Sequence, residues 1–143
     1  MITNYRLVYD FGDYMSKDTS VVVLGASPKS SRYSNMAVRQ LKSNGYRVIP
    51  VNPGHSEVEG IDTVAHLNDI NEKIHTLTLY LSPQWSERIE EDILRLNPGR
   101  VIFNPGTESS ILKKSLTKSG IPYIEACTLV MLSTGQFISS LSY

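Results

Sequence analysis

The chain has 143 residues, of which 41% are hydrophobic and 20% charged, as expected for one globular domain. Fourteen basic and fourteen acidic side chains balance, so we expect no nucleic-acid partner, because binding a phosphate backbone needs a basic surface. One cysteine, three widely spaced histidines and the lack of a long apolar run exclude an internal disulfide and predict no metal site, no membrane contact and a cytoplasmic location.

Residues 1–18 show neither helical nor strand periodicity, although four aromatic side chains fall within them. We interpret residues 1–18 as an N-terminal extension, and Met15 is a plausible native start. Residues 19–143 then form the predicted domain.

The regular pattern begins with Ser20–Leu24, a run of three valines between Ser and Leu that predicts a buried strand. Ser34 can cap a helix over residues 35–44. Residues 46–51 predict a second strand, and residues 59–65 a short third strand at the edge of the sheet.

The second half repeats the alternation more clearly. Residues 75–81 predict a fourth strand, and Ser82-Pro83 then opens a helix. That helix carries an apolar stripe expected to face the sheet, made of Trp85, Ile89, Ile93 and Leu96. Residues 100–103 and 121–124 predict the last two strands, with a helix between them and a further helical segment after Cys127.

Strands that alternate with helices predict a three-layer, Rossmann-like α/β fold, with a parallel sheet of five to six strands and helices on both faces. We expect the strand order third, second, first, fourth, fifth, with one more at the edge. The crevice then lies between the first and fourth strands, at their carboxyl ends. The loops that meet there are 25–33, 52–54, 81–85 and 104–107.

The loop after the first strand has the layout of a phosphate cradle, because a strand, Gly25, a polar loop and a helix follow one another. Lys29 and Arg32 add two cations, which favours a ligand rich in phosphate. Tyr33 could stack on the ligand or donate to a phosphate, or it could only cap the cradle. The alternative interpretation is a solvated serine-rich turn.

This loop departs from the NAD-binding fingerprint Gly-x-Gly-x-x-Gly. Ser27 and Ser30 stand where the second and third glycines belong, and the second strand ends in Asn52-Pro53 without an acidic residue for a ribose diol. The cradle therefore favours a nucleotide ligand other than NAD.

Four motifs in this order resemble the small single-domain CoA-binding proteins, which are similar to the CoA-binding domain of the succinyl-CoA synthetase α subunit. The motifs are Gly25-Ala-Ser-Pro-Lys29, Tyr46-Arg-Val-Ile-Pro-Val-Asn-Pro53, Asn104-Pro-Gly-Thr107 and Glu125-Ala-Cys127. The resemblance implies that the first loop takes the CoA phosphates, that Asn52 and Pro53 lie beside the adenosine, and that Ser82 and Pro83 lie along the pyrophosphate or pantetheine. The full set of expected binding residues is Gly25, Ala26, Ser27, Pro28, Lys29, Arg32, Tyr33, Asn52, Pro53, Ser82, Pro83, Asn104, Pro105 and Gly106.

Nothing in the sequence pairs a nucleophile with a base, so we assign no catalytic residue and expect binding of coenzyme A or an acyl-CoA without catalysis. Cys127 is interpreted as a small buried apolar side chain, and its reaction with the CoA thiol stays an open alternative. Two other functions also stay open: an NAD(P)-binding oxidoreductase-like domain, and a CoA-sensing interaction or regulatory protein. A homo-oligomer or a protein partner is compatible with any of them.

Overall fold

The structure is a computed structural model that describes residues 19–139. The predicted N-terminal extension, residues 1–18, lies outside the described residues. No helix within residues 19–139 combines the length and the apolar character needed to cross a bilayer.

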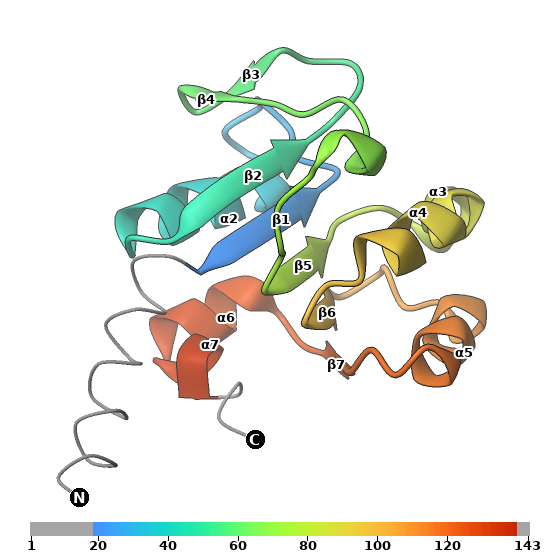
Figure 1. Cartoon of the computed structure of the whole chain (residues 1–143). Helices are drawn as coiled ribbons and strands as arrows, with labels where there is room; N and C mark the ends of the chain where they lie inside the picture. Colours follow the sequence, from blue (N-terminus) through green and yellow to red (C-terminus); the bar gives the residue numbers. More distant parts are fainter. Residues whose placement is uncertain (1–18, 140–143) are drawn as a thin grey trace, which may run out of the picture.

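A five-stranded parallel sheet forms the centre of the fold, in the order β2-β1-β5-β6-β7 (Figure 1). Its strands are β1 (Ser20–Leu24), β2 (Arg47–Val51), β5 (Thr76–Leu79), β6 (Arg100–Phe103) and β7 (Tyr123–Glu125). The chain leaves β1 toward β2 on one side and returns to β5 on the other. The order therefore reverses between β1 and β5, which is where open α/β sheets bind their ligands.

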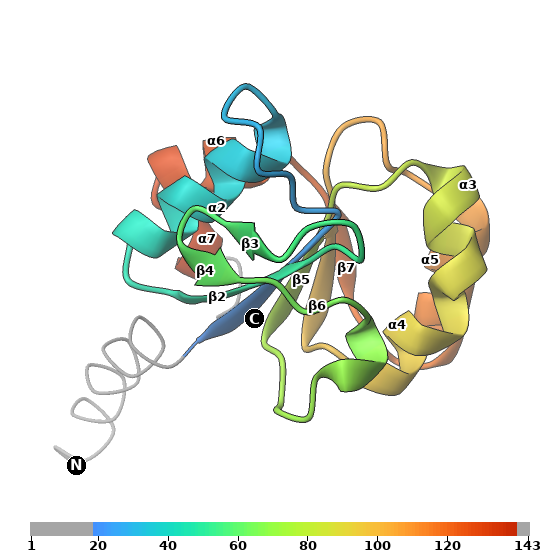
Figure 2. The same ribbon diagram turned by 90° about the horizontal axis from the view of Figure 1, so that it is seen from above.

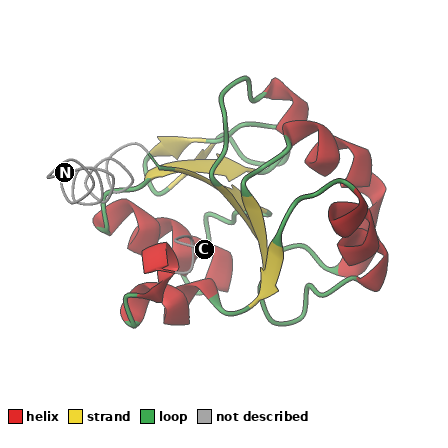
Figure 3. Cartoon of the chain, turned by 60° about the horizontal axis from the view of Figure 1, so that its bottom comes forward, coloured by secondary structure: helices red, strands yellow, loops and turns green. Residues whose placement is uncertain are grey.

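Helices cover both faces of this sheet, as the sequence predicted. Figure 2 shows α2 (Tyr33–Ser43), α6 (Thr128–Ser133) and α7 (Gln136–Ser139) on one side. The other side carries α3 (Pro83–Ser86), the 3₁₀ turn η2 (Glu87–Ile89), α4 (Glu90–Leu96) and α5 (Ser110–Lys118). Figure 3 shows the sheet in yellow between these two groups of red helices. The Rossmann-like α/β fold is thereby confirmed.

Strand β1 shows why both faces of the sheet are covered by helices. Successive side chains of a strand point to opposite faces, so Val22 and Leu24 pack toward α4 and α5, while Val21 and Val23 pack toward α2, α6 and α7. Val21, Val22 and Val23 are fully buried. A run of consecutive valines is therefore what a strand buried on both faces requires.

The prediction of a third sheet strand over residues 59–65 is wrong. The segment instead forms an antiparallel hairpin of β3 (Glu57–Val58) and β4 (Ile61–Asp62), separate from the main sheet. Glu59 and Gly60 both have positive φ, 51° and 77°, and reverse the chain between the two short strands. Only Val64 reaches the sheet, through a single bridge to Val51.

Two helix predictions also need correction. Helix α2 begins at Tyr33, and the Ser34 hydroxyl does not cap it but accepts a hydrogen bond from the Ser27 amide (3.1 Å). The single helix predicted after Ser82 is divided into α3, η2 and α4. Trp85 is consequently 50% exposed, whereas Ile93 of the same predicted stripe is fully buried.

Candidate functional site

Two cavities at the carboxyl edge of the sheet share Gly25 in their walls. Gly25 has φ +93°, and a Cβ atom there would lie 2.9 Å from Leu81 Cδ2. Its amide donates to the carbonyl of Val51 (3.0 Å), which joins the ends of β1 and β2. Only glycine therefore fits where the two cavities meet, at the point where the strand order reverses.

The first of these, here called the apolar cavity, has a volume of about 310 Å³. It lies between the ends of β1 and β2 on one side and α3–η2 on the other. Trp85 forms part of its wall, and the guanidinium of Arg88 lies 4.8 Å from the centre of the Trp85 ring. Its apolar lining consists of Leu24, Val51, Pro53, Ala65, Leu67, Leu81, Trp85 and Ile89. A flat aromatic group can pack in such a space.

Asp92 is the acidic residue in the lining of the apolar cavity. Its Oδ1 accepts hydrogen bonds from Asn68 Nδ2 (3.1 Å) and Arg95 Nη1 (3.3 Å). Asn52 lies in the same lining, and its side chain is used internally: Nδ2 donates to the Ala26 carbonyl (2.6 Å) and Oδ1 accepts from the Gly54 amide (2.8 Å). Asn52 thus ties the second loop to the first.

The second space, here called the loop cavity, has a volume of about 300 Å³ and lies beside the start of α2. Arg32 occupies the N-cap position of α2 and Tyr33 its first turn, and both side chains are exposed. No acidic residue stands in the first turn of α2, so the positive end of the helix dipole adds to the charge of Arg32. This end of the loop cavity suits an anion.

On its other side the loop cavity is bounded by Tyr80, Ser82 and the loop Pro105-Gly106-Thr107. Burial raises the pKa of Tyr80 to about 12, so its phenol stays protonated at neutral pH. Tyr80 is therefore a hydrogen-bonding group and not a base.

Asn104 has a different position from its neighbours in the same loop. Its side chain is buried, donates to Thr78 Oγ1 (2.7 Å) and the Leu79 carbonyl (2.9 Å), and accepts from the Thr128 amide (2.9 Å). Three internal hydrogen bonds use its polar atoms. Asn104 therefore joins β5, β6 and α6 and does not face either cavity.

Most of the residues predicted to bind line one of the two cavities. These are Gly25, Ser27, Arg32, Tyr33, Asn52, Pro53, Ser82, Pro105 and Gly106. Lys29 and Pro28 are exposed on the first loop outside both linings, Ala26 and Asn104 are buried, and Pro83 is half-buried at the first position of α3. Cys127 is half-buried at the N-cap of α6, also outside both linings.

The predicted crevice loops 81–85 and 104–107 contain Leu81, Trp85 and Thr107, but the list of expected binding residues left these three out. Sequence reasoning missed Arg88, His66 and Tyr80 altogether. Trp85 was also placed in a stripe facing the sheet, which assumed one continuous helix; the chain forms α3, η2 and α4 instead, and Trp85 is half exposed. The signal that points to Trp85 is its place in the predicted crevice loop 81–85. Among residues 19–139, His, Cys, Asp and Glu side chains form no group of three suited to a metal ion.

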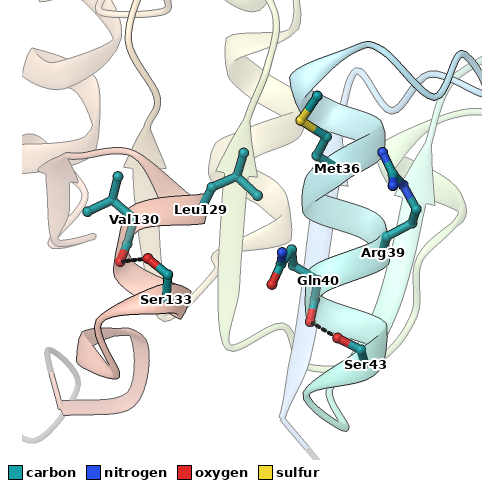
Figure 4. A pocket seen from close by; sticks show the side chains of 7 residues that line it. All are labelled: Met36, Arg39, Gln40, Ser43, Leu129, Val130 and Ser133. Carbon is teal, nitrogen blue, oxygen red and sulfur yellow. Dashed lines mark hydrogen bonds between the residues drawn. The ribbon is translucent and has the colours of Figure 1, made fainter.

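A separate groove of about 610 Å³ runs between α2 and α6 and contains none of the predicted binding residues. Figure 4 shows Met36, Arg39, Gln40 and Ser43 on one wall and Leu129, Val130 and Ser133 on the other. Arg39 belongs to this groove by position, yet its guanidinium donates to the carbonyl of Ser30 in the first loop (2.8 Å).

Comparison with known proteins identifies a family and similar folds. Residues 19–133 match the family model described as the CoA binding domain. An uncharacterized protein of known crystal structure is 42% identical, with a TM-score of 0.72 over 85% of this chain and 98% of that chain. The uncharacterized protein YneT of Bacillus subtilis is 26% identical over 57% of this chain, a match that spans only 61% of YneT.

One more distant structure has the same fold. The dinucleotide-forming acetyl-coenzyme A synthetase 1 of Ca. Korarchaeum cryptofilum, in complex with phosphate and ADP, matches with a TM-score of 0.66 and 17% identity. The match covers 80% of this chain and 27% of the synthetase, so the likeness is to one part of a much longer protein.

Proposed function

Because the chain belongs to the CoA binding domain family, we propose that it binds coenzyme A, or an acyl ester of it, in the two cavities that meet at Gly25. One observation carries the proposal: an apolar cavity and a cationic loop cavity lie on the two sides of one glycine. CoA has the matching division into a flat adenine and a phosphate-rich chain.

The adenine is assigned to the apolar cavity, between Pro53 and Trp85. The diphosphate is assigned to the loop cavity, where Arg32 and the start of α2 supply positive charge. CoA carries about three to four negative charges at neutral pH, from its diphosphate and from the 3′-phosphate monoester, whose second pKa is near 6. Two further cations are available for the remaining charge: Arg88 in the lining of the apolar cavity, and Lys29, which is exposed on the first loop outside both linings.

We further propose a role in binding and not in catalysis. Within the described linings, Asp92 is held by Asn68 and Arg95, and Tyr80 stays protonated. His66 also lines the apolar cavity, but no hydrogen bond joins its ring to a serine, threonine or cysteine among residues 19–138, so no base is paired with a nucleophile there. Residues 19–143 are proposed to act as the binding unit, in the cytoplasm, where one free cysteine is ordinary. A CoA-sensing role toward a protein partner is compatible with this proposal.

Isothermal titration with CoA, dephospho-CoA, NAD and NADP tests the proposed function. We expect CoA to bind most tightly and dephospho-CoA more weakly, because it lacks the 3′-phosphate. Trp85→Ala should weaken CoA binding, whereas Tyr123→Ala, an aromatic truncation on β7 away from both cavities, should not. Tighter binding of NAD or NADP than of CoA would refute the proposal, as would a Trp85→Ala protein that binds like wild type.

A further inference from the structure

Behind the first loop lies a buried polar group that does not line either proposed binding cavity. Asn35, in the first turns of α2, is fully buried. Its Nδ2 donates both to the carbonyl of Ser27 (3.0 Å) and to Glu59 Oε2 (3.0 Å), and its Oδ1 accepts from Arg39 Nε (2.8 Å). Asn35 therefore links α2, the first loop and the β3–β4 turn through one side chain.

Arg39 extends this network along the loop. While its Nε donates to Asn35, its Nη2 donates to the carbonyl of Ser30 (2.8 Å). Asn52 holds the Ala26 carbonyl in the same way. Carbonyl oxygens at three places in the loop are thus fixed by side chains of the surrounding structure.

Fixing a carbonyl also fixes the amide that follows it, unless the next residue is a proline. Pro28 follows Ser27 and has no amide hydrogen, so this applies to Ser30, whose carbonyl Asn35 reaches through Arg39. In a planar trans peptide the C=O and the next N–H point in opposite directions. With the Ser30 carbonyl held by Arg39, the Ser31 amide is turned to the opposite side of the same peptide group. Amides with a fixed orientation bind an anion better than mobile ones, because no ordering is needed when the ligand arrives.

Glu59 shows that the network has a conformational cost. It has φ +51°, a region that residues other than glycine rarely occupy. Lys42 Nζ donates to its backbone carbonyl (3.0 Å), and its carboxylate reaches Asn35. A glycine would suit this backbone better, but only a side chain with an acceptor can hold the Asn35 amide from this turn.

We propose that Asn35 is a positioning residue for the phosphate-binding loop and that Glu59 keeps it in place, so that the β3–β4 turn controls the order of residues 27–31. The ligand part of this inference rests on the proposed function. The loop-order part does not depend on it, since it concerns hydrogen bonds of the protein alone.

Glu59→Gly is the decisive variant. It removes the carboxylate that accepts from Asn35, and it places glycine, which tolerates positive φ, at this position. If the hydrogen bonds of Asn35 served only to stabilise the fold, removing the Glu59 side chain should lower the Tm. The positioning role predicts an unchanged or higher Tm, faster hydrogen–deuterium exchange in residues 27–32, and a CoA affinity lower by about fivefold, the smallest effect usual for coupled sites. Glu59→Gln keeps an oxygen acceptor for Asn35 and should restore both exchange and affinity.

Two further variants complete the experiment. Glu57→Ala removes one carboxylate from the same hairpin without touching Asn35, and should leave exchange and affinity as in wild type. Asn35→Asp keeps the size and the acceptor for Arg39 but removes both donors, and should show the largest increase in exchange. If it does not fold, Glu59→Gly still decides the question.

Loop exchange in Glu59→Gly equal to that of wild type overturns the inference, and so does faster exchange with unchanged CoA affinity. If wild type does not bind CoA at all, the proposed function fails. In that case the exchange measurements alone decide whether Asn35 and Glu59 order the loop.

Discussion

The two edges of the sheet carry arginines in opposite environments. At the amino edge, Arg100 is buried, donates to Thr76 Oγ1 (3.0 Å) and the Phe137 carbonyl (3.0 Å), and lies 4.7 Å from the Phe137 ring centre. Burial lowers its pKa to about 10. At the carboxyl edge, Arg32 is exposed beside a cavity.

This difference separates side chains that hold the fold from side chains free to meet a ligand. The amino edge satisfies its charges internally: Arg47 pairs with Glu72 (2.6 Å), which lowers the pKa of Glu72 and raises that of Arg47. The carboxyl edge ties down its backbone and leaves Arg32 and Lys29 exposed. A fixed backbone with free cations is the arrangement expected of an anion site.

The largest expected difference is in the free energy of unfolding, between alanine substitutions of Arg100 and of Arg32. Arg100→Ala leaves the Phe137 carbonyl and Thr76 hydroxyl without this donor and should lower the free energy of unfolding by about 3 kcal/mol. Arg32→Ala, the same truncation at an exposed site, should change it by less than about 0.5 kcal/mol. Chemical denaturation measures both, and equal losses would contradict the division between the edges.

Asn104 tests whether that division also holds within the carboxyl edge. Asn104→Ala removes three buried hydrogen bonds and should cost about 2 kcal/mol of unfolding free energy, with CoA affinity unchanged in the folded protein. The neighbouring exposed Pro105→Ala serves as the control for stability. A large loss of CoA affinity in a fully folded Asn104→Ala protein would return this residue to the binding site.

Substitution of the two exposed cations, Arg32 and Lys29, should weaken CoA binding to different extents. Arg32→Ala is expected to weaken CoA binding about tenfold, or 1.4 kcal/mol, because Arg32 lines the loop cavity. Lys29→Ala should have a smaller effect, since Lys29 lies outside both linings, and high salt should shrink both effects. Titration calorimetry at two salt concentrations checks this, and a larger effect at Lys29 would move the phosphate site along the loop.

The smallest expected effect comes from His75 at the amino edge. Burial and the nearby Arg100 lower the pKa of His75 below its usual 6.5. As pH falls below 6.5, the unfolded chain binds a proton that the folded chain does not, so stability falls with pH down to the folded-state pKa. The loss should be less than about 1 kcal/mol and absent in His75→Gln, as thermal unfolding at pH 7.5 and 5.5 can show.

Much of the fold follows from local sequence patterns. The sequence pattern predicts all five strands of the main sheet, and their alternation with helices predicts a crevice at the carboxyl ends of the first and fourth strands. The prediction of a third strand was wrong because Glu59 has a left-handed backbone conformation that reverses the chain. A residue other than glycine gives no sign of such a conformation in the sequence. The prediction that Trp85 faces the sheet assumed one continuous helix, whereas the chain forms α3, η2 and α4, and Trp85 is 50% exposed.

By itself, the sequence determined the order of strands and helices, the position of the first loop and the need for glycine at residue 25. These features depend on the spacing of apolar residues, on turn-forming residues and on the direction of the chain. All three act between residues close together in the sequence. Only the tertiary structure decided that Asn104 is held inside and that Asn35 lies between Ser27, Glu59 and Arg39. The partners of a polar side chain come from segments far apart in the sequence, and folding alone brings them together.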